Sequence, residues 1–142
     1  MKRLLILAAA LGSVSFASDM MMGKMSVMTV PLMGMGQMMG SAVVVAWPSG
    51  EHEVFVHVEG LTPGSGLYAN HIHFNETNDA MCSMQNGNKI IGLNNLMADD
   101  KGMATAYTKL PASVKFMMTP MYLNIHANTP DAVGPSIICG DF

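Results

Sequence analysis

Short runs of β-branched residues, separated by turn residues, constrain the fold of this chain most strongly. In His52–Glu59 a valine occupies every second position from 54 to 58, which is the period of a half-buried strand. No stretch of ten or more residues shows a capped helical period. Because such runs recur about every ten residues, we expect an antiparallel β-sandwich or barrel. The other expected strands are Ser26–Leu32, Ser41–Trp47, Leu67–Phe74, Met103–Leu110, Met121–Ala127 and Ser136–Gly140.

The size and charge of the chain narrow its class. Its 142 residues are enough for one domain with a single core. Hydrophobic residues make up 50% and charged residues 12%, a balance that excludes a disordered chain. The net charge of −3 excludes a nucleic-acid-binding protein that depends on a broad basic surface.

The first residues have the layout of a secretory signal peptide. Lys2 and Arg3 precede the apolar run Leu4–Leu11, and Ser15-Phe16-Ala17 places small residues at the −3 and −1 positions of a cleavage site. The apolar run is too short to span a bilayer. We therefore expect cleavage after Ala17, with an uncleaved anchor as the alternative.

This interpretation divides the chain into three parts. Residues 1–17 are the expected signal peptide, 18–25 a methionine-rich tail and 26–142 a single β-domain. The processed protein should be periplasmic or secreted and have no stable membrane insertion. It should also contain no arginine, since Arg3 is the only one in the chain.

Cys82 and Cys139 are the only cysteines. Exported compartments permit disulfides, and two cysteines allow a single pairing. The alternative is that both are thiolate metal ligands. It is less favoured because the two lie far apart in sequence and neither belongs to a Cys-x-x-Cys motif.

The histidines suggest a metal site. On a strand, His71 and His73 project from the same face with Cβ atoms about 7 Å apart, so both imidazoles can bind one ion. His126, on another expected strand, would supply a third nitrogen. A lone His-x-His is also common as a surface pair or as a structural pair. His52 and His57 have no such partner and are not expected to be ligands.

Five short motifs occur in a fixed order in the expected β-domain. They are Gly60-Leu-Thr-Pro-Gly64, His71-Ile-His73 followed by Cys82, Asn95–Gly102 before a late strand, a strand ending at His126, and Ile137-Ile-Cys139-Gly140. Together they resemble the Cu/Zn superoxide dismutase family, over about Val27 to Gly140. A chordin-type repeat is a weaker match, because it lacks this cysteine pair.

The resemblance implies a fold and a set of site residues. The family fold is a Greek-key β-barrel, an architecture related to the β-sandwich. By resemblance His71, His73 and His126 are copper ligands, and Cys82 and Cys139 form the family disulfide.

The sequence also departs from the family pattern. Between Cys82 and His126 there is no histidine, so the imidazole that bridges copper and zinc is missing. The segment Cys82–Ile91 contains no His, Asp or Glu, so no zinc is expected. The family places an arginine three residues before the second cysteine, to attract superoxide, but this chain has Ser136 there. Electrostatic steering of an anion needs positive charge near the metal.

Methionine is unusually frequent. Nine of the 17 methionines lie between Met20 and Met39. Thioether sulfur is a soft donor suited to Cu(I), and Met81 and Met84, on either side of Cys82, are further candidate ligands. Methionine is also an adaptable apolar filler. The methionines of the expected first strand and its turn therefore fit a packing role as well.

The leading hypothesis is an exported copper-binding protein that acts as a carrier, a buffer or a delivery partner. Its expected partners are a copper ion and a protein that donates or accepts copper. The rival hypothesis is an enzyme, a zinc-free copper superoxide dismutase that converts superoxide to oxygen and hydrogen peroxide. A third interpretation is a metal-free structural β-domain.

Overall fold

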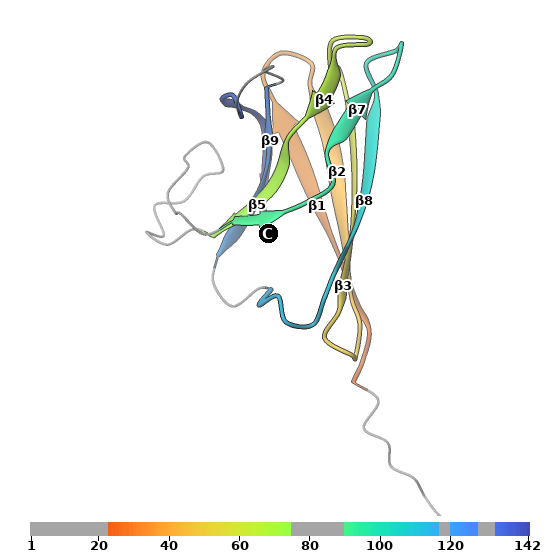
Figure 1. The fold of residues 1–142 in the computed structure, drawn as a ribbon, viewed down its shortest axis with the longest axis vertical. Coiled ribbons are helices and arrows are strands. Elements are labelled where there is room, and N and C mark those ends of the chain that lie inside the picture. Colours follow the sequence, from red (N-terminus) through yellow and green to blue (C-terminus); the bar gives the residue numbers. More distant parts are fainter. Residues whose placement is uncertain (1–22, 75–89, 117–119, 128–132) are drawn as a thin grey trace, which may run out of the picture.

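The structure, a computed structural model, describes residues 23–74, 90–116, 120–127 and 133–142 (Figure 1). These parts of the chain form strands and turns, and none of them is a helix long and apolar enough to cross a membrane. The strands are β1 (Ser26–Gly34), β2 (Met39–Ala46), β3 (His52–Glu59), β4 (Gly66–Tyr68), β5 (Asn70–Phe74), β6 (Ile90–Gly92), β7 (Leu96–Ala98), β8 (Ala104–Leu110), β9 (Met121–His126) and β10 (Ser136–Asp141).

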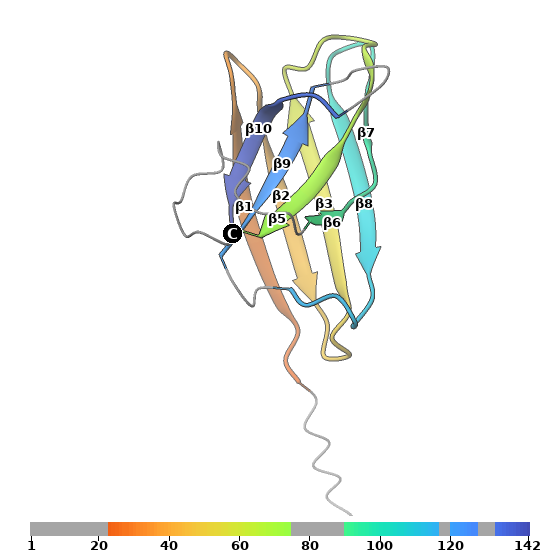
Figure 2. The same cartoon turned by 60° about the vertical axis from the view of Figure 1, so that its left-hand side comes forward.

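The strands form one large antiparallel sheet and one small sheet. The large sheet has eight strands in the order β6-β5-β9-β10-β1-β2-β3-β8, and β4 pairs with β7 in the small sheet. The large sheet curls so that its two ends approach the small sheet, and β7 packs beside β8 (Figures 1 and 2). The expected all-β barrel or sandwich is thus confirmed.

The core fills the inside of this curl. The valines of β3 point inward, and the alternate positions of the same strand face outward, as their period-2 pattern predicts. Buried apolar side chains from both halves of the sheet join them in one cluster. Its fully buried members include Leu32, Val56, Ile72, Leu96, Leu123, Ile125 and Ile138.

Most expected strands are found, with some changes in their bounds. The bounds of β3 are those expected, whereas β1 and β2 extend further into their shared hairpin. The expected strand Leu67–Phe74 is interrupted at Ala69, because β4 pairs with β7 while β5 pairs with β9. The three-residue strands β6 and β7 were not expected, since they are too short to show a period.

Two turns meet at one end of the molecule through a close backbone approach. Gly102 has a φ of 76°, and its carbonyl accepts a 3.0 Å hydrogen bond from the Leu61 amide. A Cβ on Gly102 would collide with the Leu61 carbonyl oxygen. Glycine therefore satisfies two requirements here, a left-handed backbone and close contact.

Candidate metal centre

Two adjacent strands bring three histidines together. His71 and His73 lie on β5, and His126 ends β9. In the antiparallel register His71 is opposite Asn124 and His73 is opposite Tyr122. Past the end of that ladder, the His126 amide donates to the Ala69 carbonyl over 2.9 Å. The three imidazoles therefore lie on one face of the β5–β9 pair, and Ile72, Leu123 and Ile125 occupy the core face.

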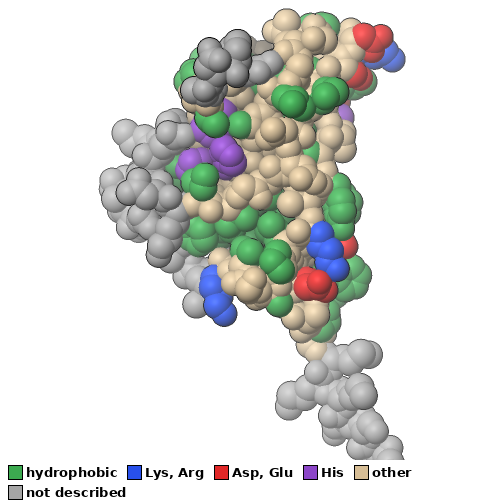
Figure 3. Space-filling model, viewed as in Figure 1, with side chains coloured by type: hydrophobic (Ala, Val, Ile, Leu, Met, Phe, Trp, Pro, Cys, Tyr) green, Lys and Arg blue, Asp and Glu red, His purple; other side chains and the backbone are tan. Residues whose placement is uncertain are grey.

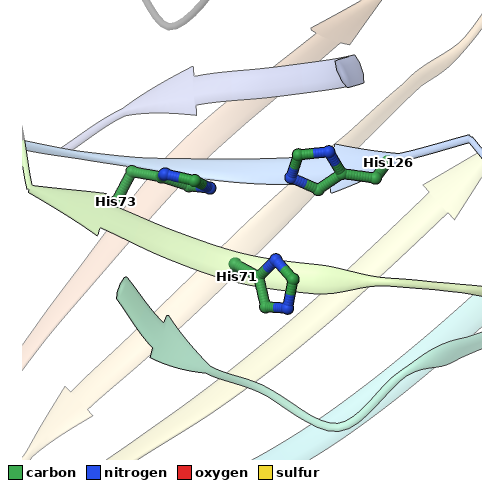
Figure 4. A group of neighbouring side chains, drawn as sticks. All are labelled: His71, His73 and His126. Atoms are coloured by element: carbon green, nitrogen blue, oxygen red, sulfur yellow. The ribbon is translucent and has the colours of Figure 1, made fainter. Parts of the chain in front are cut away.

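The three rings are close enough to hold one ion. One candidate ligand atom from each histidine lies within 4.8 Å of the others, and the ring centroids are 5.4 to 6.1 Å apart. Figure 4 shows the three side chains gathered where β5 and β9 run side by side. Two nitrogens joined to one ion by bonds of about 2 Å lie at most about 4 Å apart. Around one ion with three such ligands the nitrogens lie about 3.3–3.5 Å apart, so metal binding requires the rings to close by up to about 1.5 Å.

The backbone orients His126. Its Nδ1 is 2.9 Å from the Gly134 carbonyl oxygen, and because a carbonyl only accepts, Nδ1 carries the proton and donates. The lone pair is then on Nε2, which is buried and has no hydrogen-bond partner among the described residues. Metal-binding histidines commonly have this arrangement, in which a hydrogen bond at one nitrogen fixes the tautomer and leaves the other for the ion.

His73 is a buried imidazole with neither nitrogen satisfied. It is 4% exposed, and neither ring nitrogen has a hydrogen-bond partner in the described structure. Burial, together with the nearby His126 and His71, lowers the pKa of His73 to about 4. The ring is therefore neutral at pH 7 and keeps a lone pair for an ion.

His71 opens the group to solvent. Unlike the other two it is only partly buried, and burial, followed by the nearby His126, lowers its pKa. Figure 3 shows histidine side chains gathered at one part of the surface. An ion or a small molecule can thus reach the group from this side.

Asn124 adds a polar group to the same face. It is fully buried, and its Oδ1 accepts a hydrogen bond from the Ser136 hydroxyl. Its Nδ2 has no partner among the described atoms, which leaves an N–H donor beside the imidazoles. In the expected strand Met121–Ala127, Asn124 shares the face of His126, but no role was predicted for it. Tyr122, also on that face, was missed, although its position four residues before His126 was a usable signal.

The other two described histidines, His52 and His57, lie away from the group of three. His52 stacks on Phe116, and His57 hydrogen-bonds Thr105 and Glu59. Within the described ranges, neither belongs to the metal-binding group.

Part of the expected site falls in undescribed segments. Met81, Met84 and Cys82 lie outside the described residues, as does the expected signal peptide. Cys139, in β10, is not a free cysteine, and its expected pairing with Cys82 stays a prediction.

Comparison with known proteins adds no family assignment. No protein-family model matches the chain. No curated protein matches it either. The relation to the superoxide dismutase family therefore stays a prediction from the five ordered motifs. The structure shows an all-β fold with three histidines placed to hold a metal ion.

Proposed function

We propose that this chain is an exported copper-binding protein, related to the Cu/Zn superoxide dismutases, that carries, buffers or delivers copper. The observation that carries the proposal is the group of His71, His73 and His126 on two paired strands. Two of these rings have buried nitrogens without partners. An unsatisfied buried polar group costs about 1–3 kcal/mol, and an ion bound there would remove this cost.

Copper fits the donor set better than zinc does. Within the described residues the group consists of three imidazoles and contains no carboxylate or thiolate. Nitrogen sites bind Cu(II) more tightly than Zn(II), and Cu(I) accepts low coordination by soft or borderline donors. Structural zinc sites almost always have four protein ligands, although three histidines and a water hold zinc in some catalytic sites. A methionine such as Met81 or Met84 could supply a fourth, soft ligand to copper.

The residues around the three histidines suit both the binding of copper and its transfer to a partner. The Gly134 carbonyl orients the His126 ring, and the stack with Tyr122 orients the His73 ring. His71 is partly exposed and faces the side from which an ion would enter. A partner protein that donates or accepts copper would approach along this side. The proposed Cys82–Cys139 disulfide would tie the segment after β5 to β10 and so keep the surroundings of the site in place.

A second candidate function is a zinc-free copper superoxide dismutase. Copper bound at this site would supply the one-electron couple that the reaction needs. The observation in favour is the buried Asn124 Nδ2 beside the imidazoles, which has no partner among the described atoms and would donate a hydrogen bond to a small anion that reached the ion. Ser136, at the position of the family's arginine, supplies no positive charge to attract superoxide.

Titration of the processed chain with Cu(I) and with Cu(II) tests the proposal, with ligand type read by X-ray absorption. We expect one nitrogen-ligated copper and at least tenfold weaker binding in His71→Ala, His73→Ala and His126→Ala. His57→Ala, outside the group, is the matched control. Unchanged affinity in all three variants would remove the site. Superoxide consumption well above free-copper controls would favour the enzyme over the carrier.

A further inference from the structure

The hairpin between β1 and β2 exposes several thioethers. Met33 is 76% exposed, Met35 67% and Met39 58%, whereas Met38 packs partly against the core. Turns ordinarily carry small or polar residues such as Gly, Asn, Asp and Ser. Three of the strongly exposed methionines of the described structure are thus gathered around one turn, which we call the Met hairpin (Met33–Met39).

The backbone of the Met hairpin holds these side chains close together. Met33 and Met39 are opposite in the antiparallel register, so they emerge on the same face with Cβ atoms about 5 Å apart. Met35 lies in the turn between them, and its amide donates to the Ile137 carbonyl over 3.3 Å. The amide of Gly34 donates to the Met38 carbonyl over 3.0 Å. The turn is therefore fixed both within the hairpin and against β10.

Two grooves connect the Met hairpin with the histidine end of the molecule. Met33 and Met35 line one groove of about 280 Å³ together with Ser136, which pairs with His126. Met35 also lines a second groove, of about 490 Å³, that extends to Ala127. The β1–β2 turn and the end of β9 lie at the same end of the molecule (Figure 1).

The segment around the Met hairpin carries no charged, imidazole or thiolate side chain of its own. Residues 25–50 contain no Asp, Glu, His, Cys, Lys or Arg. Hard cations such as Mg²⁺ and Ca²⁺ prefer several oxygen ligands, and Zn²⁺ prefers nitrogen, thiolate or carboxylate ligands. Glu59 is opposite Met39 in the register of β2 and β3, but its carboxylate is already paired with His57. Thioethers suit Cu(I) and stay neutral and available in an oxidising compartment.

We propose that Met33, Met35 and Met39 form a thioether site for a soft monovalent ion, Cu(I), at the surface beside the histidine end. Met side chains have three flexible torsions, which lets three sulfurs converge on one ion from this backbone. The site does not depend on copper binding by the histidines. If both sites bind copper, the Met hairpin is the more accessible place for an arriving Cu(I).

The test uses Ag(I) as a redox-inert soft monovalent probe. The processed chain, labelled with ¹³C at its methionine methyl groups, is titrated with Ag(I) and followed by NMR. We expect the methyl signals of Met33, Met35 and Met39 to shift together within the first equivalents. Zn(II) should leave them in place. The assigned signals distinguish the hairpin from the methionines of the tail.

Variants supply the second arm. The triple variant Met33→Leu/Met35→Leu/Met39→Leu keeps apolar volume and should lose one Ag(I) equivalent, or bind it at least tenfold more weakly. Met97→Leu is the control, because Met97 is 64% exposed on β7 and belongs to no such group. If the triple variant misfolds, the methyl shifts of the unmodified chain still test whether the three methionines bind Ag(I).

The outcomes separate this inference from the proposed function. Hairpin methyl signals that do not move, or a Met97 signal that moves equally at the same Ag(I) concentration, would overturn the thioether site. If the histidine ring signals do not change on addition of Cu(II) but the hairpin methyl signals shift with Ag(I), the proposed function is wrong and the thioether site stands.

Discussion

Tyr122 and His73 stack face to face across two adjacent strands, with ring centroids 5.1 Å apart and ring planes 9° apart. They are directly opposite in the register of β5 and β9, and both are nearly fully buried. Neither nitrogen of His73 has a hydrogen-bond partner in the described structure, so we infer that this parallel stack helps to set the plane of its ring. The Tyr122 ring thus orients His73, as the Gly134 carbonyl orients His126.

Replacing Tyr122 with leucine should weaken copper binding. The variant keeps apolar volume but removes the flat surface that orients His73, and loss of such a supporting contact typically costs 10–100-fold in metal affinity. A competition titration against a copper chelator measures the change. Tyr107→Leu, which removes an exposed, tilted ring contact with Phe55, is the matched control and should bind normally. Equal affinity in the two folded variants would show that the stack does not position the ligand.

The metal-free protein should lose stability as the pH falls below about 6.5. The pKa of His73 is about 4 in the folded chain and about 6.5 when unfolded, so between these values the unfolded state binds more protons. Stability is therefore full above pH 6.5 and declines toward pH 4, and the lowered pKa values of His71 and His52 act in the same direction.

Urea denaturation at pH 7.5, 6, 5 and 4 measures this decline. His73→Phe, which keeps a flat apolar ring, should show a shallower dependence on pH over this range. An identical dependence in the variant and the unmodified protein would mean that His73 does not supply the linkage.

Copper should raise the melting temperature of the chain, and its removal should reverse the effect. An ion that binds only the folded state at 100 times its Kd adds about 2.7 kcal/mol. His126→Ala should abolish the shift, because it removes the ligand that the backbone holds in place. Thermal unfolding with and without a copper chelator tests this. A similar shift in His126→Ala would place the stabilising ion elsewhere.

Gly102→Ala should destabilise the fold more than Gly64→Ala. Both positions have a positive φ, 76° and 64°, so both variants incur roughly 1–2 kcal/mol of left-handed backbone strain. At Gly102 the new Cβ would also meet the Leu61 carbonyl, whereas at Gly64 it would meet nothing. Chemical denaturation of the two variants compares them directly. Equal losses would show that the backbone at Gly102 moves to accept the methyl group.

The sequence predicted what local patterns determine. The valines of β3 gave its bounds correctly, because one face of this strand meets the core along its whole length. The break between β4 and β5 could not be seen, since the chain changes partners at Ala69 for reasons that lie in distant strands. The short strands β6 and β7 exist only through their pairings.

For the candidate site, too, the sequence predicted the local arrangement but not the contacts between strands. The spacing of His71 and His73 placed them on one face, but their approach to His126 depends on β9 being the neighbour of β5. The roles of Asn124 and Tyr122 follow from register and side-chain orientation, which no single sequence reveals.

The ladder between β5 and β9 has a consequence for how an ion would leave. All three imidazoles are attached to a hydrogen-bonded sheet whose central strand is buried at every position, so the chelate cannot open by the swing of a loop. Release would then proceed by associative ligand substitution, with an incoming donor bonding to the ion on the His71 side before the imidazoles let go. The rate of ion exchange would therefore depend on the concentration and softness of the acceptor.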